Sequence, residues 1–109
     1  MRDGEEMMQP RGYVVIDVEV HDQKAYAEYL RLAEPTHAPF QGKFLVRGGN
    51  AESLEDTWLP KRFVIIEFPT RANAKAWYES QGYQHARKAR LGAAKFRAIL
   101  VDGVPPPTP

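Results

Sequence analysis

The segment from Tyr13 to Val20 alternates between two kinds of residue, and this pattern restricts the fold more than any other part of the sequence. Successive side chains of a β-strand point to opposite faces, so the segment predicts a strand with one apolar face and one mixed face. The apolar face carries Val14, Ile16, Val18 and Val20. Such a strand needs partners in a sheet and a layer that covers its apolar side.

A helical stretch follows this strand. Asp22 is typical of a residue that caps a helix, and apolar side chains then recur at helical spacing up to Ala33. The pattern predicts a helix from about Gln23 to Glu34. Pro35 disfavours helical geometry in the residue before it, so we expect the chain to turn at Glu34.

Residues 40–49 read FQGKFLVRGG and predict a short second strand from Lys43 to Arg47. Simple alternation divides its residues between two faces, with Phe44 and Val46 on one and Lys43, Leu45 and Arg47 on the other. Gly48 and the two residues after it tolerate the positive φ angle that a bend or bulge demands. We therefore expect Arg47 to point away from the helices, toward a pocket closed by a second copy of the chain.

The second half of the chain repeats the pattern of strand and helix. The run KRFVIIEF predicts a third strand over residues 61–68, and its β-branched centre favours a central position in the sheet. Thr70 is a candidate cap for the next helical stretch, which SQGYQ interrupts, so this stretch is either one broken helix or two. The run FRAILVDG, residues 96–103, predicts a fourth strand.

The order β-α-β-β-α-β is typical of a ferredoxin-like α+β fold, in which helices cover one face of a four-stranded antiparallel sheet. The other face would expose apolar residues to water, so we expect a homodimer with its sheets packed face to face, a dimeric α/β barrel. The apolar residues expected on this open face are Val15, Leu45, Phe63, Ile65, Phe96 or its neighbours, and Leu100. The charged residues expected to point inward are Asp17, Glu19, Arg47 and Glu67.

The 109 residues suffice for one domain. We expect a flexible tail over residues 1–11, a single domain over 12–104 and a Pro-rich tail over 105–109. A net charge of +1 provides no general attraction for nucleic acid or an anionic membrane. The absence of cysteine excludes disulfides and thiolate chemistry, and the start lacks the apolar segment of a secretory signal, so we expect a cytoplasmic protein.

Four blocks of the sequence are similar to blocks of a known protein family: GYVVIDVEVHD, QGKFLVRGG, W-x-P-K-R-F-V-I-I-EFP and AWYESQGYQHARKAR. In this order, over about Gly12 to Gly103, the chain resembles the small bacterial domain-of-unknown-function family thirteen-thirty. The resemblance implies a dimeric α/β barrel, which several cofactor-free monooxygenases, isomerases and dehalogenating enzymes share, and it implies no established activity. The recurring positions that match are Arg47, Trp58, Arg62, Trp77, Ser80, Tyr83 and Arg90.

The chain also departs from the family's pattern at three places. The family usually has Gly-Gly-Arg where this chain has Gln41-Gly42-Lys43, and Pro-Glu-Tyr where it has Gln81-Gly82-Tyr83. It tends to have glycine where Asp56 stands. The cation at position 43 is retained.

Two residues are candidates for direct chemistry on a ligand. The planar guanidinium of Arg47 matches a carboxylate, although a salt bridge to Asp17 or Glu67 is the alternative. His37 has an ordinary pKa near neutrality and could serve as a general base, as could the acid Glu67, although a packing or surface role for His37 is the alternative.

Aromatic and basic residues of the last helical stretch complete the candidate ligand site. Trp77 and Tyr83 could form an aromatic wall, or could fill the core, which helical spacing favours for Trp77. Arg90 belongs to a basic cluster whose pattern is typical of a solvent-exposed helix face. Arg90 itself could instead point inward. The histidines lack metal-ligand spacing and no glycine-rich phosphate loop precedes a helix, so neither a metal nor a nucleotide cofactor is expected.

These residues favour a small dimeric protein that binds a small anionic organic molecule in a pocket between sheet and helices. A cofactor-free isomerase or monooxygenase-like enzyme is a second hypothesis, which rests on the analogy of fold. A structural or regulatory dimer without a ligand is the third. The residue pattern does not decide whether the protein is an enzyme.

Overall fold

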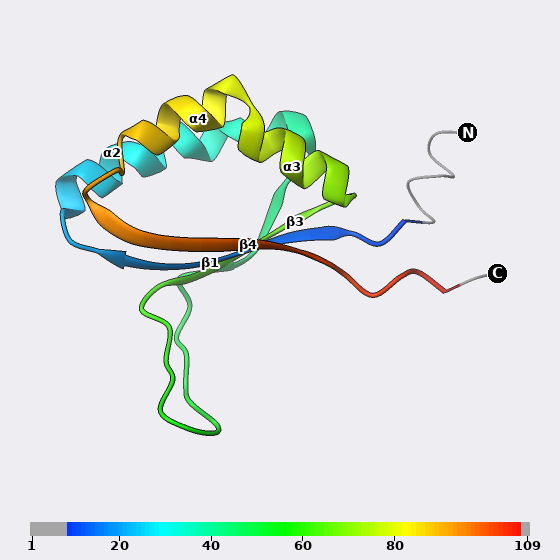
Figure 1. Ribbon diagram of the computed structural model, residues 1–109, viewed down its shortest axis with the longest axis horizontal. Coiled ribbons are helices and arrows are strands. Elements are labelled where there is room, and N and C mark those ends of the chain that lie inside the picture. The colour runs from blue at the N-terminus through cyan, green and yellow to red at the C-terminus, as the bar shows by residue number, and fades with distance from the viewer. Residues whose placement is uncertain (1–8, 108–109) are drawn as a thin grey trace.

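The computed structural model describes residues 9–107 as one sheet covered on a single face by helices (Figure 1). The strands are β1 (Gly12–Val20), β2 (Lys43–Arg47), β3 (Phe63–Phe68) and β4 (Ala94–Asp102), and the helices are α2 (Gln23–Ala33), α3 (Arg71–Glu79) and α4 (Gln81–Lys88). The sheet order is β2-β3-β1-β4 and the strand pairs are antiparallel. The predicted ferredoxin-like α+β fold is therefore confirmed, with β3 inside the sheet.

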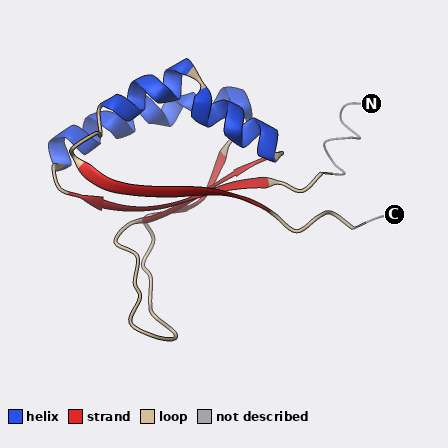
Figure 2. Cartoon of the chain, viewed as in Figure 1, coloured by secondary structure: helices blue, strands red, loops and turns tan. Residues whose placement is uncertain are grey.

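The core lies between the sheet and the helix layer, and the colouring by secondary structure separates these two layers (Figure 2). Alternate residues of β1 and β3 form the sheet side of this core, and residues of α2, α3 and α4 form its helix side. The largest fully buried side chains are Val18, Phe68, Trp77 and Tyr83. Burial of these apolar surfaces is the main force that holds helices and sheet together.

The helices begin where the sequence places capping side chains. Asp22 accepts a hydrogen bond from the Ala25 amide at 3.1 Å, and Thr70 accepts one from the Asn73 amide at 3.1 Å. Ser80 ends α3 and caps α4, where its hydroxyl oxygen accepts a hydrogen bond from the Tyr83 amide at 3.2 Å. The interrupted stretch is therefore two helices, because one serine serves the end of the first and the start of the second.

The chain after α2 differs from the expected turn at Glu34. Glu34 keeps helical φ and ψ angles of −55° and −45°, and its amide donates to the Leu30 carbonyl. Two 3₁₀ turns follow, η1 (Glu34–Thr36) and η2 (Ala38–Phe40). Pro35 lies in the first turn of η1, a place where a missing N–H disrupts nothing, so Glu34 keeps helical geometry and the chain continues into the 3₁₀ turn.

A β-bulge in β2 reverses the expected direction of Arg47. Phe44 lies opposite Ile66 of β3, but the register then shifts so that Arg47 lies opposite Val64, whose side chain is buried beneath the helices. The extra residue, Leu45, moves every later side chain of the strand to the other face. The prediction that Arg47 points to the non-helical face was wrong, because simple alternation takes no account of a bulge.

Strand β4 also corrects the expected open face. Phe96 and Leu100 lie opposite Val18 and Val14 of β1 and pack toward the core rather than on the open side. The open face of β4 carries Ile99 instead, which is 62% exposed, together with the neighbouring Val101.

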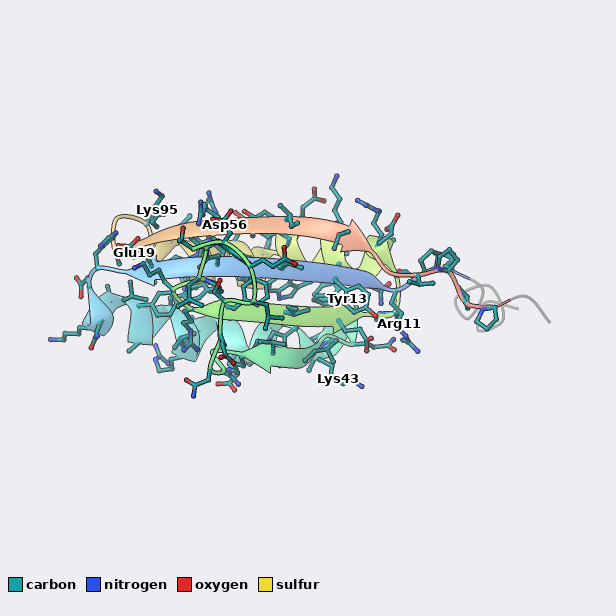
Figure 3. The ribbon with its side chains drawn as sticks, turned by 90° about the horizontal axis from the view of Figure 1, so that it is seen from below. Arg11, Tyr13, Glu19, Lys43, Asp56 and Lys95 are labelled. Carbon is teal, nitrogen blue, oxygen red and sulfur yellow. The ribbon has the colours of Figure 1, made fainter. Side chains whose placement is uncertain are left out.

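Figure 3 views the open face directly. Arg11, Tyr13 and Lys43 are labelled near one end of the sheet, and Glu19 and Lys95 near the other. Two acids of this face have partners on neighbouring strands: Asp17 accepts a hydrogen bond from Arg97 at 3.0 Å, and Glu67 accepts one from the Tyr13 hydroxyl at 2.9 Å. The expected salt bridge between either acid and Arg47 is absent, because Arg47 lies on the other side of the sheet.

The connection between β2 and β3 extends from the sheet on the side opposite to the helices (Figure 1). It begins at Gly48, whose φ is +70° and whose amide donates to the Phe63 carbonyl at 2.7 Å. Asp56 in the same connection has φ +66°, and Gln41 before β2 has φ +63°. Glycine adopts such left-handed turns without strain, whereas Gln41 and Asp56 adopt them at a cost.

Gly48 is the position in this connection that we expect to tolerate substitution least. A Cβ there would lie 2.7 Å from Arg62 Nη1, and an L-residue would be strained at this φ. Gly48→Ala should lower the free energy of unfolding by about 1–2 kcal/mol, measured by chemical denaturation. Gly49→Ala is the matched control, because nothing lies within 4 Å of its Cβ position, and it should be close to neutral. Equal losses in both variants would contradict this account.

Candidate functional site

A cavity of about 40 Å³ lies between α2, the sheet and the chain that follows α2. Its apolar walls are largely aromatic, and they include Tyr26, Tyr29, Phe44, Trp77 and Phe96. Its charged or titratable lining residues are Glu34, His37, Arg47 and Arg62. A buried water needs about 10–15 Å³ measured in this way, so the cavity has room for a few waters or for one small polar group.

Arg47 reaches the cavity because the bulge turns it toward the helices. Its Nη1 donates to Glu34 Oε2 at 3.0 Å, and its guanidinium lies 4.2 Å from the centre of the Phe44 ring. The hydrogen bond from Arg47, and then its charge, lower the pKa of Glu34 below its ordinary value. The Glu34 side chain is 56% exposed, so this ion pair lies at the edge of the cavity rather than in the core.

Arg62 lines the same cavity beside the Tyr26 side chain and lacks the carboxylate partner that Arg47 has. No carboxylate oxygen lies within 4.0 Å of its guanidinium in residues 9–107, and its Nε is buried without a hydrogen-bond partner there. The guanidinium packs against Gly48, where a side chain would displace it. Arg62 was not among the predicted site residues. The alternation of side chains in the third strand nevertheless predicts that Arg62 lies on the same face as Val64 and Ile66, which is the core face.

His37 contributes a ring nitrogen to the cavity. Its Nε2 is buried and has no hydrogen-bond partner within the described part of the chain, and its ring packs edge-on to Phe44 with centroids 4.7 Å apart. Its carbonyl accepts the amides of Phe40 and Gly42, which fixes the backbone there. Burial, and next the charge of Arg47, lower the pKa of His37 below its ordinary value, so the ring is neutral at neutral pH.

Tyr83 and Arg90 lie behind the aromatic wall rather than in the cavity lining. The Tyr83 and Tyr29 hydroxyls form a hydrogen bond of 2.8 Å, and Arg90 Nη2 donates to the Tyr83 hydroxyl at 3.4 Å. Arg90 is only 5% exposed and stacks 3.5 Å from the centre of the Phe96 ring. Burial raises the pKa of Tyr29 far above its ordinary value, so this phenol keeps its proton.

The predicted site residues thus fall into three places. Arg47, His37 and Trp77 line the cavity, and Trp77 is also the core residue that its helical spacing favours. Tyr83 and Arg90 support the cavity wall from behind. Glu67 lies across the sheet, on the open face with Tyr13.

No group of three or more His, Asp or Glu side chains that could hold a metal ion comes together among residues 9–107. In the same range no helix is both long and apolar enough to cross a membrane.

Comparison with known proteins identifies the class of fold and the family. The structure resembles RPA0582 from Rhodopseudomonas palustris, a protein of unknown function, with TM-score 0.71 and 21% identity over 90% of this chain and 85% of that one. It also resembles SnoaB, a cofactor-independent oxygenase from Streptomyces nogalater, with TM-score 0.59 and 14% identity over 84% of this chain and 91% of SnoaB. HapK from Hahella chejuensis has TM-score 0.51 and 12% identity over 85% of this chain and 92% of HapK.

At these identities the likeness shows the fold alone. The sequence matches the model of the family described as "Domain of unknown function (DUF1330)" over residues 11–104, and the chain belongs to that family. No curated protein matches the sequence significantly.

The lowered pKa of His37 predicts a pH dependence of stability. The unfolded chain takes up a proton on this histidine as the pH falls through about 6.5, whereas the folded chain resists. Stability should therefore be intact above this pH and decrease as the pH falls below it. His37→Gln should reduce the decrease in melting temperature between about pH 7.5 and pH 5.5. The exposed His85→Gln is the control, and an unchanged pH profile in the His37 variant would contradict the burial of this ring.

Proposed function

We propose that this protein binds a small organic anion, a carboxylate, in the cavity between sheet and helices. The observation that carries the proposal is Arg62 in the cavity lining, whose guanidinium has no carboxylate partner within residues 9–107 and whose buried Nε has no hydrogen-bond partner there. Buried charges are normally paired or in contact with a ligand, because an uncompensated charge away from water is unfavourable.

The charge balance of the cavity supports the same conclusion. Arg47 and Arg62 both line it, and Glu34 is the acid that lines it with them. Guanidinium groups bind carboxylates through paired hydrogen bonds, and the surrounding aromatic walls exclude water that would weaken the interaction. The small cavity accepts a carboxylate head group, and the rest of the ligand would extend past the exposed Glu34.

A second candidate function is proton transfer to or from the bound acid, which the unpartnered Nε2 of His37 favours. A neutral imidazole with a free nitrogen in the cavity can accept a proton from a ligand carbon or oxygen. The fold is compatible with such an activity but does not by itself support more than binding. Consumption of an added acid, followed by NMR, would separate proton-transfer chemistry from binding alone.

We also propose that the open face of the sheet packs against a second copy of the chain. Ile99 is 62% and Val101 42% exposed there, beside the partly exposed Val15 and Ile65 of the neighbouring strands. Apolar patches of this kind on soluble proteins are commonly contact surfaces. The acids Asp17 and Glu67 of this face already have local partners, so packing would leave neither of them unpaired.

The carboxylate proposal predicts separate effects on binding and on stability. Arg62→Met should keep the melting temperature within a few degrees of the wild-type value, because it leaves no carboxylate without its partner. The same substitution should weaken thermal stabilisation by acetate and butyrate about tenfold or more. The control Arg31→Met removes an exposed arginine of α2 whose partner is Glu28, and should keep the wild-type response. If no small carboxylate stabilises the wild type, the proposal fails.

The dimer proposal predicts a change of mass on substitution. Ile99→Asp should shift the molecular mass from that of a dimer toward that of a monomer in sedimentation equilibrium, because it buries a charge in the apolar contact. Leu91→Asp is the control, since Leu91 is 56% exposed in the turn before β4 and lies off the open face. A monomeric wild type at micromolar concentration would contradict the proposal.

A further inference from the structure

We infer that the ligand is a small dicarboxylate, and that Glu34 is an internal carboxylate which occupies one of its two binding positions in the empty protein. This inference rests on the proposed function. One ligand carboxylate binds Arg62, and the other replaces the Glu34 carboxylate on Arg47. The two guanidiniums then bind the two ends of one molecule.

The fold brings the two arginines to the same end of the cavity. Arg47 ends β2 and Arg62 directly precedes β3, and the hydrogen bond of 2.7 Å from the Gly48 amide to the Phe63 carbonyl joins the two strands there. The Arg62 guanidinium packs on Gly48, the residue next to Arg47. Both side chains line the cavity, so a short molecule can reach both.

The two arginines differ in whether a ligand carboxylate must displace another carboxylate to reach them. Arg47 already holds a carboxylate, at 3.0 Å, whereas Arg62 holds none within the range that the structure covers. The Glu34 side chain is more than half exposed, so it can move into water without desolvation, and exposed ion pairs contribute little net stability. Arg47 would remain oriented after this movement, because its guanidinium also stacks on Phe44.

The cavity is small, so whether a longer ligand fits depends on the position of the Glu34 side chain. About 40 Å³ is space for one carboxylate head group, and the position on Arg47 is already occupied by the Glu34 carboxylate. Because Glu34 itself lines the cavity, its departure both enlarges the space and frees Arg47. A monocarboxylate can therefore bind at Arg62 with Glu34 in place, whereas a dicarboxylate competes with Glu34.

The test compares succinate with butyrate, which has the same number of carbons and one carboxylate, by calorimetric titration of three proteins. These are the wild type, Glu34→Gln and the control Glu28→Gln, which removes the same charge from an exposed residue of α2 outside the cavity lining. Glu34→Gln should bind succinate about threefold or more tightly than the wild type, with a smaller gain for butyrate. Glu28→Gln should change neither affinity.

The outcomes separate this inference from the proposed function. Equal gains for succinate and butyrate in Glu34→Gln, or no gain at all, would overturn the role of Glu34 while carboxylate binding stands. Equal gains in Glu34→Gln and Glu28→Gln would also overturn it, because they would reflect net charge alone. If neither acid binds the wild type or Glu34→Gln, the proposed function itself fails.

Discussion

The one-residue register shift between Phe44 and Val46 determines which face of the sheet carries the cationic site. With a regular strand, Arg47 would lie on the open face, beside acids that could neutralise it. The bulge instead puts its guanidinium over Phe44 and beside Glu34 at the end of α2. Gly48 completes the arrangement, because its left-handed backbone and its missing side chain leave the space that Arg62 fills.

The two faces of the sheet differ in how their charges are compensated. On the open face, Asp17 and Glu67 are held by basic or hydroxyl groups of neighbouring strands. On the helix side, Arg62 lines the cavity and Arg90 lies buried behind its aromatic wall, and neither has a carboxylate partner in residues 9–107. Arg90 is buried against aromatic rings, whereas Arg62 is half-buried and lines the cavity, so Arg62 is the better position for an incoming anion.

The order of elements, the helix caps and the inside position of β3 could be predicted because each depends on short-range patterns of side chains. The direction of Arg47 could not, since a bulge depends on how two strands pair and leaves no mark in the alternation of one strand. The same limit applies to Phe96, whose face is decided by its pairing with β1. Arg62 was visible on the core side of its strand, but its lack of a partner is a property of three-dimensional packing. The expected tail over residues 1–11 lies largely outside the described residues, and its flexibility stays a prediction.

The central claim is that Arg62, a half-buried cation without a carboxylate partner in residues 9–107, receives an anion. The most direct measurement is a succinate titration of the protein labelled with ¹⁵N, followed through the Nε–Hε signals of the arginine side chains. The account predicts that the Arg62 signal shifts and saturates with added succinate, while the signal of Arg90 behind the aromatic wall moves little. An Arg62 signal that stays unchanged, or that drifts without saturation together with those of exposed arginines, would contradict it.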